Sequence, residues 1–150
     1  MASSLYRSCA DAMKTVIDAL SLAHVDGRLV TVTVRKRPHN NGKWERDITL
    51  SHDAPRPGIG TNQDEDLGYG VRVTIVGASM SHSSEDQDRF MYWEQLIRNA
   101  FYGKRLSGVT EVWCCDYEPA KPLADGPYQK DDRDVSEFII RCWTRELVRS

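Results

Sequence analysis

The chain has 150 residues, the size of one typical domain. Hydrophobic residues make up 40% of it and charged residues 28%, a globular composition that excludes collagen-like, low-complexity and fully disordered chains. Lys and Arg total 20 against 22 Asp and Glu, so the formal charge is −2, whereas proteins that bind nucleic acid tightly are usually basic. We therefore expect a single domain over residues 1–150.

The cysteines and the apolar runs indicate the cellular compartment in which the chain is expected. No apolar run approaches the roughly 20 residues that a transmembrane helix needs, and the first residues lack the pattern of a signal peptide. Cys9, Cys114, Cys115 and Cys142 include an adjacent pair and no CxxC spacing. Free thiols in a reducing compartment, the cytoplasm, are the expected state.

The first third of the chain predicts one helix and two strands. Apolar residues recur at helical spacing from Leu5 to Leu20, after a serine placed to cap the helix. The period then changes to two, and Val30–Val34 and Trp44–Leu50 read as strands. Between them His39–Gly42 contains Asn-Gly, which tolerates the positive φ of a tight turn. These two strands are predicted to form a hairpin with a polar tip.

The rest of the chain predicts a strand, a helix and two further strands. Alternating apolar residues indicate a strand at Val71–Val76. A capping-box pattern and an acidic first turn then predict a helix from about Glu85 to Tyr102, with Gly103 as its terminating residue. Strands are expected at Val109–Tyr117 and from Phe138 to about residue 146.

Two long loops are predicted, at about residues 53–70 and 118–134, because both segments combine prolines with clusters of acidic residues. Both exceed most connections in compact domains, which favours a functional role. The predicted order is α-β-β-β-α-β-β. It indicates an α+β fold of two layers, in which two helices cover a mixed or antiparallel sheet of about five strands.

Patterns that carry catalysis are incomplete in this sequence. Gly77–Ser81 lacks the second glycine of a nucleophile elbow, and Gly58–Gln63 lacks the third glycine of a dinucleotide loop and precedes a strand. The four histidines are scattered without metal-ligand spacing. The sequence therefore predicts no catalytic residue, no cofactor and no metal.

Opposite charges are segregated along the chain. The candidate interface residues are Arg35, Lys36, Arg37, Lys43 and Arg46 on the basic side, and Asp64, Glu65, Asp66, Asp131, Asp132 and Asp134 on the acidic side. Each group alone is also typical of a solvated surface, and the basic group could meet an acidic partner or DNA phosphate. Together they suit head-to-tail self-association, in which the basic arm of one subunit meets an acidic loop of the next.

The order of elements and four stretches of sequence also carry a resemblance. The stretches are Gly68–Val76, the helical Arg89–Phe101, Val112–Cys115, and Asp134–Arg141 after a proline-containing loop. Over most of its length the chain resembles the tail terminator proteins, also called tail completion or neck proteins, of long-tailed bacteriophages and prophages.

This resemblance implies a two-layer subunit of a homo-hexameric ring on the tail tube. Such a ring ends polymerisation of the tail tube protein and presents a surface to the head-side connector, while DNA passes through the lumen without sequence-specific contacts. The chain would then be a structural protein of the virion neck, made in the host cytoplasm. The alternatives are another head-tail connector (a head-closure or adaptor protein), a non-viral α+β interaction module, and an enzyme.

Overall fold

A computed structural model describes residues 4–24, 27–35, 47–57, 64–79, 84–120 and 133–147 of the chain. In chain order the elements are α1 (Leu5–Ala19), β1 (Val32–Val34), β2 (Asp47–Pro57), β3 (Asp64–Ser79), α2 (Ser84–Phe101), β4 (Val112–Pro119) and β5 (Arg133–Leu147). The strands form a five-stranded sheet in the order β1-β2-β3-β5-β4. The predicted α+β fold, with its mixed sheet and its order of elements, is confirmed.

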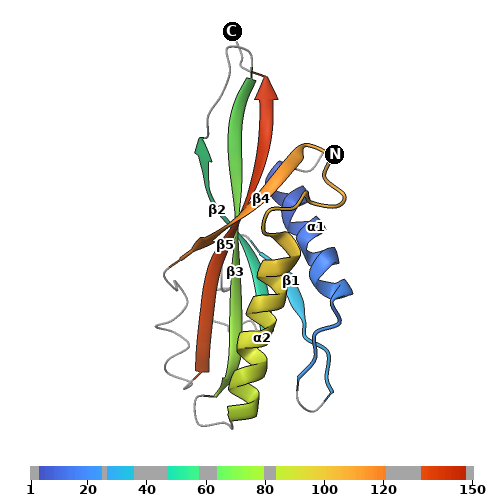
Figure 1. The fold of residues 1–150 in the computed structure, drawn as a ribbon, viewed down its shortest axis with the longest axis vertical. Helices are drawn as coiled ribbons and strands as arrows, with labels where there is room; N and C mark the ends of the chain where they lie inside the picture. Colours follow the sequence, from blue (N-terminus) through green and yellow to red (C-terminus); the bar gives the residue numbers. More distant parts are fainter. Residues whose placement is uncertain are drawn as a thin grey trace.

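Both helices lie on the same face of the sheet (Figure 1). α1 packs against β1, β2 and β3, and α2 packs against β3, β4 and β5. Every second residue of the central strands points into this layer. The largest fully buried side chains there are Met13 and Ile17 of α1, Ile97 and Phe101 of α2, Ile48 and Leu50 of β2, Val71, Val73 and Ile75 of β3, and Phe138 and Ile140 of β5.

The helix ends follow the sequence signals. The Ser4 hydroxyl accepts a hydrogen bond from the N–H of Arg7 at 3.2 Å, which caps α1. α2 ends before Gly103, whose φ of 71° is the left-handed conformation that glycine adopts without strain. The N–H of Gly103 donates to the carbonyl of Cys115 at 2.8 Å, and the Cys115 N–H donates to the carbonyl of Lys104 at 2.9 Å. The segment after α2 thus lies along the outer edge of β4.

The predicted hairpin of the first two strands is wrong, because β1 pairs with β2 in parallel. Val32 lies opposite Ile48 and Val34 opposite Leu50. Parallel neighbours cannot be joined by a tight turn, so the chain must return to the starting end of β1 before β2 begins. The Asn-Gly turn that suggested the hairpin lies outside the described residues.

The predicted loop at residues 53–70 is also wrong, since β2 continues to Pro57 and β3 already begins at Asp64. The prolines are tolerated because β1 covers β2 only from Ile48 to Leu50. Beyond that point β2 is an edge strand, and its register with β3 shifts between Asp53 and Arg56. Proline is found in strands at such edges and irregularities.

The second predicted loop is shorter than expected at both ends. β4 extends to Pro119 and β5 begins at Arg133, so the expected strands at 109–117 and 138–146 are observed at 112–119 and 133–147. Residues 121–132 lie outside the described part of the chain. β5 pairs with β3 over nearly its whole length, from Leu147 opposite Asp64 to Arg133 opposite Ser79.

Candidate functional site

Ion pairs lie on the face of the sheet that the helices leave uncovered. Because Val71, Val73 and Phe138 point toward the helices, their neighbours Arg72 and Glu137 point to the other face. Nη1 of Arg72 donates to Oε2 of Glu137 at 2.7 Å, and Nη2 lies 3.4 Å from Oδ2 of Asp53. The Glu137 side chain is 0% exposed. This carboxylate therefore depends on its neighbours in the protein, not on water, for stabilisation of its charge.

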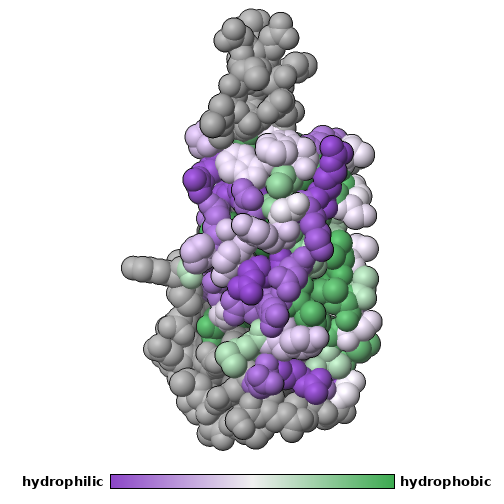
Figure 2. Space-filling view, in the orientation of Figure 1, coloured by the Kyte–Doolittle hydropathy of each residue, from purple (hydrophilic) through white to green (hydrophobic). Residues whose placement is uncertain are grey.

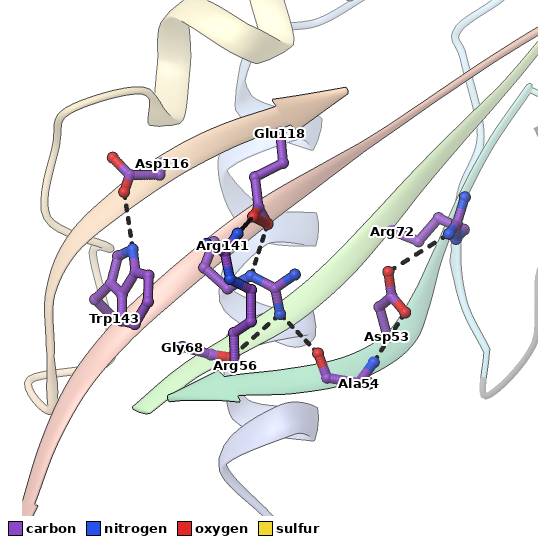
Figure 3. Close-up of polar contacts among 9 residues, drawn as sticks. All are labelled: Asp53, Ala54, Arg56, Gly68, Arg72, Asp116, Glu118, Arg141 and Trp143. Carbon is purple, nitrogen blue, oxygen red and sulfur yellow. Dashed lines mark hydrogen bonds and ion pairs between the residues drawn. The ribbon is translucent and has the colours of Figure 1, made fainter. Parts of the chain in front are cut away.

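A second cluster on this face is centred on Arg141 (Figure 3). Its Nε donates to Oε2 of Glu118 at 2.7 Å, and its Nη1 donates to the carbonyls of Ala54 at 2.7 Å and Gly68 at 3.3 Å. Glu118 also pairs with the exposed Arg56. The Arg141 side chain is only 6% exposed, and its contacts join β4, β5, β3 and β2. We call this set of contacts the Arg141 brace.

Two glycines of β3 make room for the Arg141 brace. A Cβ atom at Gly68 would lie 2.6 Å from Cδ of Arg141, and one at Gly70 would lie 2.8 Å from its Nη1 and 3.0 Å from Cβ of Asp53. Any side chain at these positions would collide with the arginine, which lies flat across the strand. Glycines that suggest a loop in the sequence are thus required by a side chain from β5.

In both clusters the arginine and carboxylate side chains neutralise one another's charge. The guanidinium groups of Arg72 and Arg141 offer hydrogen-bond donors and no acceptor, so they serve as fixed donors to the carboxylates. Among the described residues, no group of three or more His, Cys, Asp or Glu side chains is arranged to hold a metal ion. The arrangement ties four strands together and offers no general base that is free of an arginine partner within either cluster.

A third polar cluster fixes the start of β2. Asp47 has a φ of 68°, a left-handed conformation that Asp tolerates better than most residues. Its Oδ2 accepts hydrogen bonds from the N–H and the Oγ1 of Thr31, both at 2.9 Å. Its Oδ1 lies 2.9 Å from Nε2 of His24, whose ring stands edge-on to Trp93 at 5.0 Å. One buried carboxylate thus joins β2 to the segment before β1.

All four cysteines are free thiols, as expected, and three of them meet in the core. Cys9 of α1, Cys115 of β4 and Cys142 of β5 are 0% exposed. Hydrogen bonds with Cys115 and Cys9, and then burial, raise the pKa of the Cys142 thiol. The neighbouring Cys114 is only half-buried, because adjacent residues of a strand face opposite sides of the sheet. Burial, followed by the nearby Asp116 carboxylate, raises the pKa of Cys114.

Thiol labelling should distinguish these cysteines. At pH 7.5 we expect iodoacetamide to alkylate only Cys114 in the folded protein, and more slowly than free cysteine, because the thiolate is the reactive form and its pKa is raised. In urea all four thiols should react. Mass spectrometry of peptides identifies the sites. Native labelling of Cys142 at the rate of Cys114 would contradict the buried cluster.

Two exposed apolar surfaces lie at the two edge strands. The first is a groove of about 200 Å³ beside the end of α1 and the start of β1, lined by Ile17, Leu22, Leu29, Val30 and Val32 with Asp18 and Ser21. We call it the α1–β1 groove. Figure 2 shows apolar side chains gathered on this side of the molecule, at the right-hand edge of the view. The second surface, the aromatic pair, consists of Tyr102 after α2 and Trp113 of β4, which are 60% and 45% exposed.

The predicted interface residues are only partly placed by the structure. Arg35 is half-buried after β1, where its N–H donates to the carbonyl of Leu50 at 2.7 Å. Asp64, Glu65 and Asp66 begin β3 and lie opposite Leu147, Glu146 and Arg145 of β5, so these acidic residues belong to a strand and not to a loop. Asp134 lies in β5. Lys36, Arg37, Lys43, Arg46, Asp131 and Asp132 lie outside the described residues.

The residues that brace the sheet were missed in the sequence, although a signal was present. Arg72 and Arg141 each interrupt a run of apolar residues in a strand that reads as buried. A charge at such a position needs a partner on a neighbouring strand. The sequence does not say which strand that is, because Asp53 and Glu118 lie in segments that were predicted to be loops.

Comparisons with known proteins complete this description. No protein-family model and no curated protein matches the chain. Among solved structures, the chain is similar to one described as a PVC sheath/tube terminator of an extracellular contractile injection system in the extended state. That similarity covers 100% of this chain and 59% of the other, with 11% sequence identity and a TM-score of 0.48. It is a similarity of fold. This chain thus spans about three fifths of the length of that protein.

No helix in the described ranges is both long and apolar enough to cross a membrane.

Proposed function

We propose that this chain is a structural subunit of a phage tail or a tail-like apparatus, a terminator that caps the tail tube. The observation that carries the proposal is the order of elements. The sequence resembles tail terminator proteins, this resemblance implies a two-layer α+β subunit, and the fold has that order with both helices on one face of the sheet. The cap would end tube polymerisation and join the tube to the head-side connector, with DNA passing through its lumen.

The chemistry of the described surfaces supports a structural role. Arg72 and Arg141 are ion-paired with carboxylates of neighbouring strands, so these charged groups hold the sheet together. Among the described residues that line the α1–β1 groove, all but Ser21 and Asp18 are apolar, and Asp18 is the single titratable one. An enzyme site normally brings several polar or titratable groups into one pocket. An apolar groove at a sheet edge fits contact with another protein better.

The proposed partners follow from this role. Copies of the chain would form a homo-hexameric ring, made in the host cytoplasm and located in the virion neck, that contacts the tail tube protein on one side and the connector on the other. Basic residues of one copy would face acidic residues of the next, as the segregation of charge suggests. The residues concerned are Arg35, Lys36, Arg37, Lys43 and Arg46 with Asp64, Glu65, Asp66, Asp131, Asp132 and Asp134.

The test is the mass of the purified protein in solution, alone and mixed with purified tail tubes, with the mixture imaged by negative stain. A six-membered ring, or a monomer that closes into a ring on tube ends and stops their growth, is the expected result. A protein that stays monomeric at high concentration and leaves growing tube ends bare would overturn the proposal. Binding to the head-side connector alone would do so too, in favour of a head-closure or adaptor role.

A further inference from the structure

We propose that Cys115 and Cys142 form a redox-controlled lock, in which a peroxide oxidises the two thiols to a disulfide that fixes β4 to β5. This lock goes beyond the proposed function and does not rest on it, because it uses contacts within one chain. It gives a role to the buried thiols, which the ion pairs of the sheet leave unused.

The register of the sheet places the two thiols directly opposite each other. Cys115 of β4 pairs with Cys142 of β5 in an antiparallel ladder. Cys142 lies two residues after the buried Ile140, so its side chain points to the face that the helices cover. Residues directly opposite in such a ladder carry their side chains on the same face. Both thiols are therefore in the same layer, and both are 0% exposed.

The main-chain hydrogen bonds identify this pair as the closer of the two kinds of antiparallel pair. The N–H of Cys115 donates to the carbonyl of Lys104, and its carbonyl accepts from the N–H of Gly103. Both groups thus point away from β5, which makes Cys115 and Cys142 a non-hydrogen-bonded pair. The Cα atoms of such pairs lie about 4.5 Å apart. Disulfides span roughly 4.4–6.8 Å between Cα atoms, so the bond can form without a change of register.

The thiols already contact one another. Hydrogen bonds with Cys115 and with Cys9 of α1, followed by burial, raise the pKa of the Cys142 thiol. The same bond with Cys142 lowers the pKa of Cys9, although burial and the Glu111 carboxylate oppose this change. Cys142 therefore has two possible disulfide partners. Cys115 is favoured, because strand pairing fixes its distance from Cys142, whereas Cys9 approaches from a helix packed on the sheet.

Oxidation of this pair requires a brief opening of β4, because both thiols are buried. β4 is an edge strand, and its outer side at Cys115 is covered by the short segment after α2. Elements at the margin of a fold open at a lower free energy than the whole domain. Hydrogen peroxide is little larger than water and can enter such an opening.

The reaction consumes one peroxide for each disulfide. One thiolate sulfur attacks the O–O bond and becomes a sulfenic acid, and the first water is released. The second thiolate then attacks that sulfur, so the S–S bond forms as the hydroxyl leaves in the second water. The two sulfurs lose two electrons in total, and the two oxygens of the peroxide gain them. The two thiol hydrogens leave in the waters.

The disulfide changes what β4 can do. Thiols stay reduced in a reducing compartment and form disulfides in an oxidising one. The reduced chain can therefore fold with both thiols free, while β4 still opens locally. Transfer to an oxidising environment then joins this edge strand covalently to β5, which lies inside the sheet. The lock thus stabilises the edge of the sheet after folding is complete.

The experiment treats the folded protein with hydrogen peroxide in a Cys114→Ser background, which removes the half-buried thiol. Peptide mass spectrometry without reduction should find Cys115 joined to Cys142, with an intact mass lower by two hydrogen atoms. The disulfide should raise the Tm by about 5–10 °C. It should also slow hydrogen exchange of the β4 amides by at least about tenfold. Dithiothreitol should reverse both changes.

Cys9→Ala in the same background is the matched control, because it removes a thiol of the cluster and leaves the proposed pair intact. It should still form the disulfide, whereas Cys142→Ala should not. A disulfide between Cys9 and Cys142, oxidation without a disulfide, or a disulfide that forms only in urea would overturn the inference. So would an oxidised protein whose Tm and β4 exchange are unchanged. The peptide map needs neither alanine variant, so it decides even if one fails to fold. Ring formation is measured separately, and its failure would overturn the proposed function alone.

Discussion

Replacing Arg141 by methionine is expected to lower the free energy of unfolding by about 3–5 kcal/mol. Arg141 is 6% exposed and donates to Glu118 and to the carbonyls of Ala54 and Gly68. Methionine keeps much of the aliphatic stem that lies over Gly68 but removes the charge and every donor. Glu118, which is 20% exposed, would then lose its less solvated partner, and two carbonyls would lose theirs. Urea denaturation followed by circular dichroism measures the change.

Arg56→Met is the matched control for this prediction. Arg56 pairs with the same Glu118 carboxylate, but its side chain is 62% exposed, so water replaces much of what the pair provides. Exposed ion pairs contribute about 0–1 kcal/mol, and we expect a loss within that range. If the two variants lost equal unfolding free energy, the buried Arg141 would stabilise the protein no more than the exposed Arg56 does. That result would contradict the prediction.

Replacing Asp47 by alanine is expected to lower the free energy of unfolding by about 2–4 kcal/mol, because it removes hydrogen bonds and adds backbone strain. The Thr31 N–H and hydroxyl lose their shared acceptor, which costs about 1–3 kcal/mol when donors remain partly buried. The φ of 68° at this position adds roughly 1 kcal/mol for a residue with a Cβ and no polar side chain to bond locally. The contact with His24 is lost as well.

A series at this position separates the two terms. Asp47→Asn keeps an oxygen acceptor and tolerates the left-handed conformation, so it should cost least. Asp47→Gly removes the hydrogen-bond acceptor, but glycine still adopts the left-handed conformation without strain. Its stability should therefore lie between those of the asparagine and alanine variants. Midpoints of urea unfolding give the order. If glycine is as stable as the wild type, the hydrogen bonds to Thr31 contribute nothing measurable and backbone strain is the whole effect.

The parts of the fold that depend on local pattern could be predicted from the sequence. Both helices, the Ser4 cap and the stop at Gly103 follow from spacing and from single-residue conformational preferences, which act within one or two turns. The strand core at Val71–Val76 follows from its alternation. Cys115 and Cys114 facing opposite sides follows from the period of a strand.

What could not be predicted depends on residues distant in the sequence. The parallel pairing of β1 with β2 is a choice of partner, and the alternation of Val30–Val34 is the same for either direction. Gly68 and Gly70 are strand residues only because Arg141, more than 70 residues later, lies over them. Pro55 and Pro57 are strand residues only because β1 stops short of them. The α1–β1 groove likewise forms from segments whose contact no spacing reveals.

The place of β5 in the sheet has a consequence for how the protein is made. β5 is the last strand in chain order, yet it lies between β3 and β4. The 16 residues of β3 are therefore synthesised long before β5, which is one of the two strands that pair with β3. β4 has no partner strand until β5 has been synthesised. Unpaired edges of this length readily pair with other chains, so nascent copies on one messenger are at risk of joining wrongly. The completed sheet, and with it the surface around Trp113, exists only after synthesis of β5.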